Sequence, residues 1–176
     1  MNSLFLLGLV GALILVSGAA WPEGKDVNHP AKSVKNWLFA LGALFMLTYS
    51  LLGYLQGETI FFVLLQSLAV VASILMMLNV RDDIDTPIIA VIGLGLIVYS
   101  LYLFEGYQTV FFVLGLSGIG MGYAFQTGTI RRELALTLGS IMVAFFSYLE
   151  ASMIFMWLNI FFAIFSGYYL TKSINR

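Results

Sequence analysis

Hydrophobic residues run along this chain in seven long stretches, and short polar segments separate them. The stretches cover approximately residues 3–20, 35–54, 59–79, 86–104, 109–126, 133–149 and 152–171. A helix needs roughly 17–25 predominantly apolar residues to cross the hydrocarbon core of a bilayer, and each stretch reaches that length. The pattern therefore predicts an all-α, polytopic membrane protein with seven transmembrane helices.

The basic residues indicate how these helices are oriented. The chain has eight Lys and Arg residues. All of them follow the first, third, fifth or seventh stretch: Lys25, Lys32, Lys35, Arg81, Arg131, Arg132, Lys172 and Arg176. Because cytoplasmic loops are enriched in Lys and Arg, we predict an outer N-terminus and a cytoplasmic C-terminus. The outer turns carry one carboxylate each, which we interpret as solvated turn residues: Glu58, Glu105 and Glu150.

The end of the first stretch, Ser17-Gly18-Ala19-Ala20, resembles the small-residue cleavage region of a signal peptide. A signal peptide begins with a positively charged segment, whereas Met1–Leu7 contains no Lys or Arg. We therefore expect the first stretch to be a transmembrane helix of a multi-pass protein in the cell's inner (plasma) membrane.

The composition excludes several classes of protein. Hydrophobic residues make up 61% of the chain and charged residues 10%, whereas soluble domains have about 45–50% and about 25%. The formal net charge is −1, which leaves no basic surface for nucleic acid. The chain has no Cys and a single His, His29, and it lacks phosphate loops and nucleophile–base pairs. We therefore expect neither an enzyme nor a bound metal or cofactor.

The sequence contains internal repeats. At an offset of 50 residues the second and third stretches match the fourth and fifth, and the last hairpin joins at an offset of 94. The matched segments are Tyr49-Ser50-Leu51 with Tyr99-Ser100-Leu101, Phe61–Leu64 with Phe111–Leu114, and Ile60-Phe61 with Ile154-Phe155. Repeats are typical of transporters, whose sites lie where the repeats meet.

A second register, at an offset of 107, pairs the first three stretches with the last three. Leu7–Gly11 then matches Leu114–Gly118, and the fourth stretch is left as a linker. This 3+1+3 arrangement predicts a three-helix bundle over residues 1–80, a linker helix over 81–107 and a second bundle over 108–176.

Several segments resemble those of a known group of seven-helix transporters. Lys35-Asn36-Trp37 begins the second stretch, a Gly42-to-Tyr49 run and a Gln56-Gly57-Glu58 turn follow, and the third stretch carries Leu64-Leu65-Gln66. This hairpin is similar to that of the SWEET sugar transporters, the PQ-loop proteins and the Pnu nicotinamide riboside transporters. The resemblance implies a 3+1+3 fold with the N-terminus outside, as the charges also predict.

The resemblance also implies which residues bind substrate. Tyr49 matches an aromatic residue of that hairpin, Gln66 the polar residue of the third helix, and Asn159 a second polar residue in the last helix. We expect Gln66 and Asn159 to donate and accept hydrogen bonds between stretches 2, 3, 6 and 7, with Tyr49 and Trp157 as apolar walls. Either amide has a simpler interpretation as a polar contact between helices.

Gly115, Gly118 and Gly122 make the fifth stretch thin, and Gly118-x-x-x-Gly122 is typical of closely packed membrane helices. A more specific interpretation is that this helix is flexible and acts as a hinge during alternating access.

No stretch has an ionisable residue in its middle, and such residues mark ion-coupled pumps. We therefore predict a facilitator that moves a small neutral, sugar- or vitamin-like solute through the lipid bilayer by alternating access. One alternative is an oligomeric urea- or amide-type channel built from two-helix hairpins, which would make the chain a homo-oligomer. Another is an accessory or substrate-binding membrane subunit.

Overall fold

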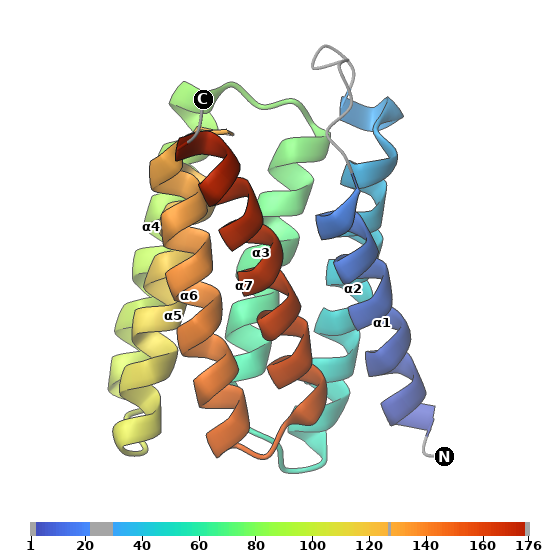
Figure 1. Ribbon diagram of the computed structural model, residues 1–176. Helices are drawn as coiled ribbons and strands as arrows, with labels where there is room; N and C mark the ends of the chain where they lie inside the picture. The colour runs from blue at the N-terminus through green and yellow to red at the C-terminus, as the bar shows by residue number, and fades with distance from the viewer. Residues whose placement is uncertain (1–2, 22–29, 127, 175–176) are drawn as a thin grey trace. The chain divides into compact units, whose positions relative to one another are not determined.

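The computed structural model describes residues 3–21, 30–126 and 128–174. Over these residues it contains seven α-helices, one 3-10 turn and no strand (Figure 1). The elements are α1 (Ser3–Ala20), η1 (Pro30–Lys32), α2 (Val34–Leu55), α3 (Phe61–Met77), α4 (Asp82–Tyr102), α5 (Tyr107–Ala124), α6 (Ile130–Leu149) and α7 (Met153–Ile174). The predicted all-α class and its seven helices are confirmed. His29 lies outside the described residues.

Five of the helices are long and apolar enough to cross a membrane: α1, α2, α4, α6 and α7. The 17 residues of α3 rise by only about 26 Å, slightly less than the roughly 30 Å of the hydrocarbon core. In α5 a polar first turn and four glycines dilute the apolar residues. The chain is therefore a polytopic membrane protein by the length and composition of its helices.

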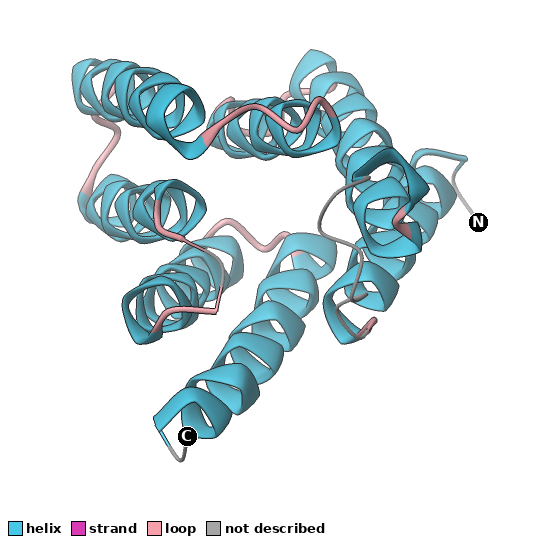
Figure 2. Cartoon of the chain, turned by 90° about the horizontal axis from the view of Figure 1, so that it is seen from above, coloured by secondary structure: helices cyan, strands magenta, loops and turns pink. Residues whose placement is uncertain are grey.

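Side chains and turns define where the helices begin and end. Ser33 caps α2 and Thr129 caps α6, because each hydroxyl oxygen accepts the backbone N–H three residues on, at 3.4 and 3.3 Å. The helix α4 begins four residues before the predicted start at 86, since acidic residues such as Asp83 and Asp85 are favoured in a first turn. The connections α2–α3, α3–α4, α4–α5 and α6–α7 take three to five residues each (Figure 2).

Two turns that follow α2 and α6 share one geometry. Gly57 and Ala151 both have positive φ angles, 98° and 55°. The next N–H in each turn, from Glu58 and from Ser152, donates to the carbonyl five residues before it, at 3.0 and 2.9 Å. This is the Schellman arrangement in which a left-handed residue ends a helix. Ala151 occupies a conformation that glycine adopts more easily.

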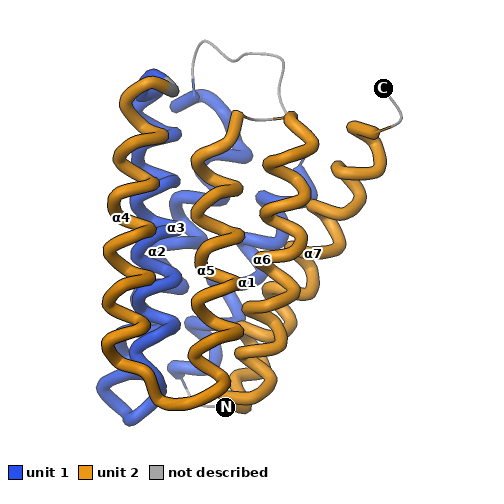
Figure 3. The backbone as a smooth tube through the Cα atoms, turned by 90° about the vertical axis from the view of Figure 1, so that its left-hand side faces the viewer, with its two compact units in different colours: residues 1–81 blue, residues 82–176 orange. Residues whose placement is uncertain are grey.

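The chain divides into two compact units, Met1–Arg81 and Asp82–Arg176 (Figure 3). In the first unit α2 packs against both α1 and α3, and η1 contacts α2 and α3. In the second unit α4, α5, α6 and α7 each pack against their neighbours in the chain. The predicted linker helix, α4, therefore packs on α5 and belongs to the second unit. The 3+1+3 arrangement stays a prediction.

Glycines bring α1 and α2 into close contact. A Cβ added to Gly42 would lie 2.9 Å from the backbone nitrogen of Leu15, and one added to Gly11 would lie 3.1 Å from Sδ of Met46. Both distances are shorter than ordinary van der Waals contact. No larger residue fits at either position without separating the two helices.

The contact between α5 and α6 is closer still, and glycines again lie where the two helices meet. A Cβ on Gly118 would lie 2.7 Å from Cα of Gly139, and a Cβ on Gly115 would lie 2.9 Å from the nitrogen of Val143. Gly122 meets the side chain of Leu136. The three glycines singled out in the sequence therefore all lie where the two backbones approach each other.

The two contacts correspond residue by residue. Gly11 faces Met46 as Gly115 faces Val143, which sets an offset of 104 residues between α1 and α5 and of 97 between α2 and α6. The offset of 104 differs by about one helical turn from the 107 expected from sequence. Apolar helices built from few residue types can match in several sequence registers. The helix contacts show which of these registers the two units share.

Candidate functional site

Gln66 is the most unusual polar residue in the first unit. It lies in α3 with 3% of its surface exposed, between the buried side chains of Leu65 and Leu68 in sequence. Its Oε1 atom is buried and has no hydrogen-bond partner among the described residues. An unsatisfied buried polar group costs about 1–3 kcal/mol. The folded chain therefore retains a hydrogen-bond acceptor at an energetic cost.

Asn159 lies in α7 of the second unit and is 4% exposed. Its Nδ2 donates to the backbone carbonyl of Phe155 at 2.8 Å, one turn earlier in the same helix. The second predicted amide is thus as deeply buried as Gln66, but part of its hydrogen-bonding capacity is used locally.

The burial patterns of α3 and α7 coincide at an offset of 93 residues. All four buried residues of α7 have a buried counterpart in α3 with similar chemistry. The pairs are Phe62 with Phe155, Leu65 with Leu158, Gln66 with Asn159, and Ser73 with Ser166. The offset of 94 expected from sequence would pair Asn159 with Leu65, and burial corrects it by one residue. The two amides occupy equivalent positions in their own units.

The same comparison extends to α2 and α6 at the offset of 97. Five buried residues of α2 have buried counterparts in α6: Gly42 with Gly139, Ala43 with Ser140, Met46 with Val143, Tyr49 with Phe146, and Ser50 with Ser147. The first unit has three buried polar residues, Ser50, Gln66 and Ser73, within its described part. Each has a buried polar counterpart in the second unit.

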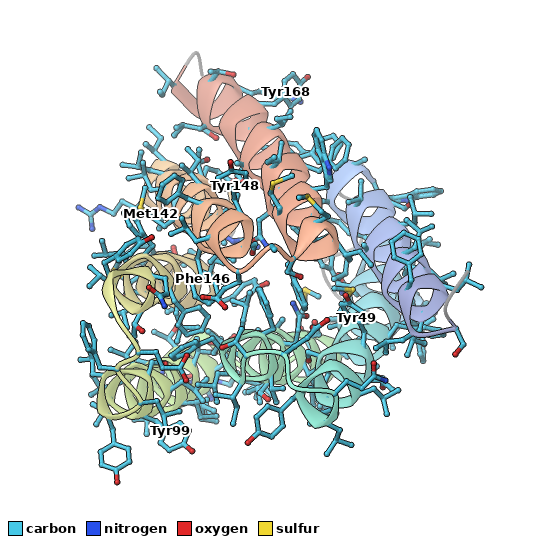
Figure 4. The ribbon with its side chains drawn as sticks, turned by 90° about the horizontal axis from the view of Figure 1, so that it is seen from below. Tyr49, Tyr99, Met142, Phe146, Tyr148 and Tyr168 are labelled. Atoms are coloured by element: carbon cyan, nitrogen blue, oxygen red, sulfur yellow. The ribbon has the colours of Figure 1, made fainter. Side chains whose placement is uncertain are left out.

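The two tyrosines matched at the offset of 50 lie in different environments. Tyr49 is buried in the first unit with 7% of its surface exposed, whereas Tyr99 is 43% exposed and points outward from α4 (Figure 4). Tyr49 is therefore available as part of an internal wall, and Tyr99 has the exposure expected of an aromatic residue facing lipid.

Trp157 is exposed, unlike Tyr49, Gln66 and Asn159. It is 55% exposed, and its ring packs on Phe161 with a centroid distance of 6.4 Å. Because helical residues are spaced by about 100°, Trp157 lies about 200° from Asn159, on the opposite side of α7. The structure therefore does not place this ring as a wall beside Asn159.

The turns after α2 and α6 hold carboxylates with perturbed acidity. Burial raises the pKa of Glu58, whose carboxylate lies against Gly53. Burial raises the pKa of Glu150 as well, and the neighbouring Glu105 carboxylate adds to this shift. Glu58 and Glu150 are therefore partly desolvated rather than fully solvated turn residues.

Glu133 is a buried carboxylate that directly follows Arg131 and Arg132 in sequence. It lies in the first turn of α6 with 8% of its surface exposed. Ser140 and Ser147, which are also buried, follow it at intervals of seven residues. That interval is two helical turns, so the three lie on one stripe of α6. The heptad spacing is the sequence signal that would have revealed it.

Within the described residues no group of three or more His, Asp or Glu side chains is arranged to hold a metal ion. Comparisons with known proteins add no assignment, because no family model, no curated protein and no solved structure matches this chain. The fold therefore defines the class, an all-helical polytopic membrane protein. The resemblance to the SWEET, PQ-loop and Pnu group stays a prediction.

Proposed function

We propose that this protein is a facilitator that moves a small uncharged solute across a membrane by alternating access. The observation that carries the proposal is the buried, unpartnered Oε1 of Gln66. A protein that keeps such an acceptor in an apolar helix forgoes stability, and a ligand that donates a hydrogen bond would recover it.

The chemistry of the helices limits the class of solute. A carbonyl oxygen accepts hydrogen bonds, so the solute must present a hydroxyl or N–H group to Gln66. The described helices carry charged residues only in their end turns, so no charged side chain would compensate a buried ionic solute. A sugar, a neutral vitamin or an amide fits these conditions, and an organic anion does not.

The positions of the polar residues favour a carrier over a channel of repeated hairpins. At the hairpin offset of 50, Gln66 corresponds to Leu116, an apolar residue. At the offset of 93 between α3 and α7 it corresponds to Asn159, and the amide is preserved. A repeat that preserves the polar residues is the better guide to the functional unit. We infer that α1–α3 and α5–α7 are the two moving halves and α4 is their connection.

Ligand-dependent thermal stability tests the proposal. The purified protein would be melted with glucose, sucrose, riboflavin, urea and acetamide as uncharged solutes, and with thiamine and nicotinamide riboside as cations. A ligand at 100 times its Kd stabilises by about 2.7 kcal/mol, which corresponds to a rise in Tm of about 5–11 °C for a chain of this length. We expect an uncharged compound to produce this shift.

The control variants make the result specific. Gln66→Leu should abolish the shift, whereas Gln56→Leu, at an exposed glutamine in the turn after α2, should leave it intact. A shift with cations alone, or a shift that survives Gln66→Leu, would contradict the proposal.

Uptake into liposomes then separates the remaining alternatives. A carrier saturates with solute concentration, whereas flux through a channel stays linear over the same range. Failure to transport alone, together with recovery of transport when a copurifying membrane protein is added, would instead identify an accessory subunit.

A further inference from the structure

Three cations lie at one end of the second unit. Arg131 and Arg132 lie in the first turn of α6, and Lys172 lies in the last turn of α7. The two helices pack against each other and are joined by the short turn around Glu150 and Ala151. They are therefore antiparallel, and the beginning of α6 lies at the same end as the end of α7 (Figure 1).

These cations have no protein counter-ion within the described part of the chain. Arg131 and Lys172 are exposed and Arg132 is half-buried, and none forms an ion pair with another described residue. Arginines in a first turn are also repelled by the positive end of the helix dipole. Their placement favours binding of an external anion.

The acidic residues at this end of the unit do not cover the cluster. Asp83 and Asp85 begin α4, which packs on α5 and makes no contact with α6. Glu133 follows the arginines in α6, but it is buried. The surface formed by Arg131, Arg132 and Lys172 therefore remains positive.

The length of the helices places this surface at the boundary of the bilayer. The 20 residues of α6 rise by about 30 Å, which equals the thickness of the hydrocarbon core. One turn before Lys172, the ring of Tyr168 is 60% exposed and packs edge-on to Tyr169, with centroids 5.5 Å apart. Exposed tyrosines are typical of the headgroup region.

The approach to the cluster is open. Gly128, in the turn before α6, has a positive φ of 80°, and no atom lies within 4 Å of the position that its Cβ would occupy. A headgroup therefore has room to reach the beginning of α6.

We propose that Arg131, Arg132 and Lys172 form a binding surface for the phosphate of an anionic phospholipid headgroup. The inference is independent of the proposed transport function. Each basic residue near an anionic membrane surface contributes about a fivefold gain in affinity. We expect a graded loss as the three residues are neutralised, about fivefold for one and about a hundredfold for all three.

The test measures thermal stability of the full chain in detergent micelles with increasing fractions of phosphatidylglycerol or phosphatidylcholine. Phosphatidylglycerol should raise Tm and phosphatidylcholine should not. The half-maximal fraction of phosphatidylglycerol should rise for Arg131→Gln and Lys172→Gln and rise further in the triple variant with Arg132→Gln. Should the triple variant fail to fold, the two single variants still decide the outcome.

Two controls address non-specific effects. Lys32→Gln removes an exposed cation from η1 in the other unit and should raise the half-maximal fraction less than Arg131→Gln does, because Lys32 is not part of the proposed binding surface. Soluble glycerol phosphate at equal concentration should not replace the lipid, since the mixed micelle supplies the high local concentration of headgroups. The inference is wrong if both lipids stabilise equally, if Lys32→Gln weakens the effect as much as Arg131→Gln, or if glycerol phosphate alone gives the full shift.

Discussion

Replacing Gln66 with leucine is the sharpest test of how the helix α3 is built. The substitution removes the amide, whose Oε1 is buried and has no partner among the described residues, and keeps a side chain of similar size. A polar group chosen for stability alone would be satisfied. We therefore expect Gln66→Leu to stabilise the fold while it abolishes solute binding.

The magnitude follows from the cost of the unsatisfied group. An unpartnered buried acceptor costs about 1–3 kcal/mol, and 1 kcal/mol corresponds to about 2–4 °C in Tm for a chain of 150–250 residues. The variant should therefore melt about 2–12 °C higher than the natural chain in the absence of solute.

The equivalent residue provides a matched comparison with the opposite sign. Asn159→Leu removes the Nδ2 donor that bonds the carbonyl of Phe155 at 2.8 Å. A net hydrogen bond contributes about 0.5–1.5 kcal/mol, so this variant should melt about 1–6 °C lower. Two substitutions to leucine at equivalent positions are thus expected to move Tm in opposite directions.

Intrinsic fluorescence is the appropriate assay, because the chain has three Trp and no Cys for a thiol-reactive dye. Unfolding would be followed in one detergent for the natural chain and both variants. A fall in Tm for Gln66→Leu, or equal shifts for the two variants, would refute the argument that Gln66 is retained at the expense of stability.

Three further predictions concern the turns and the helix contacts. Ala151→Gly should raise stability by about 1 kcal/mol, measured as Tm, because glycine relieves the left-handed backbone; no gain would contradict the observed φ of 55°. Gly118→Val should cost about 1–3 kcal/mol, since its Cβ would lie 2.7 Å from Cα of Gly139, and a neutral effect would exclude this contact. Glu150 has a raised pKa, so its stabilising contribution is present below pH 4.5 and is lost as pH rises through the folded pKa. Glu150→Gln should therefore flatten the decline of Tm with rising pH, and Glu105→Gln should flatten it in part. Unchanged profiles of Tm against pH would argue against the coupling of the two carboxylates.

The number and positions of the helices were predictable because hydrophobic runs of membrane length leave few other solutions. The predicted ranges differ from the observed helices by a few residues, most at α4, where the aspartates extend the first turn. The structural class, an all-helical membrane protein, followed from this hydrophobic pattern alone.

The faces of the helices were harder to predict. Nearly every position in α7 is apolar, so no periodicity separated Trp157, which is exposed, from Leu158, which is buried. The sequence also left the repeat register ambiguous by one residue at Asn159. Glu133 adjoins two arginines in sequence, which favours a surface position, yet its position on α6 turns it inward. Burial depends on the neighbouring helix, which local sequence does not identify.

The packing of each helix on its chain neighbours bears on how the protein is made. Within the first unit α2 contacts α1 and α3, and within the second unit every helix contact joins consecutive helices. Such a topology has a low contact order, which favours rapid folding. Each helix can dock on the one synthesised just before it, while the ribosome is still extending the chain. The glycine contacts of α1 with α2 and of α5 with α6 then form early, as hairpins on which the later helices of each unit assemble.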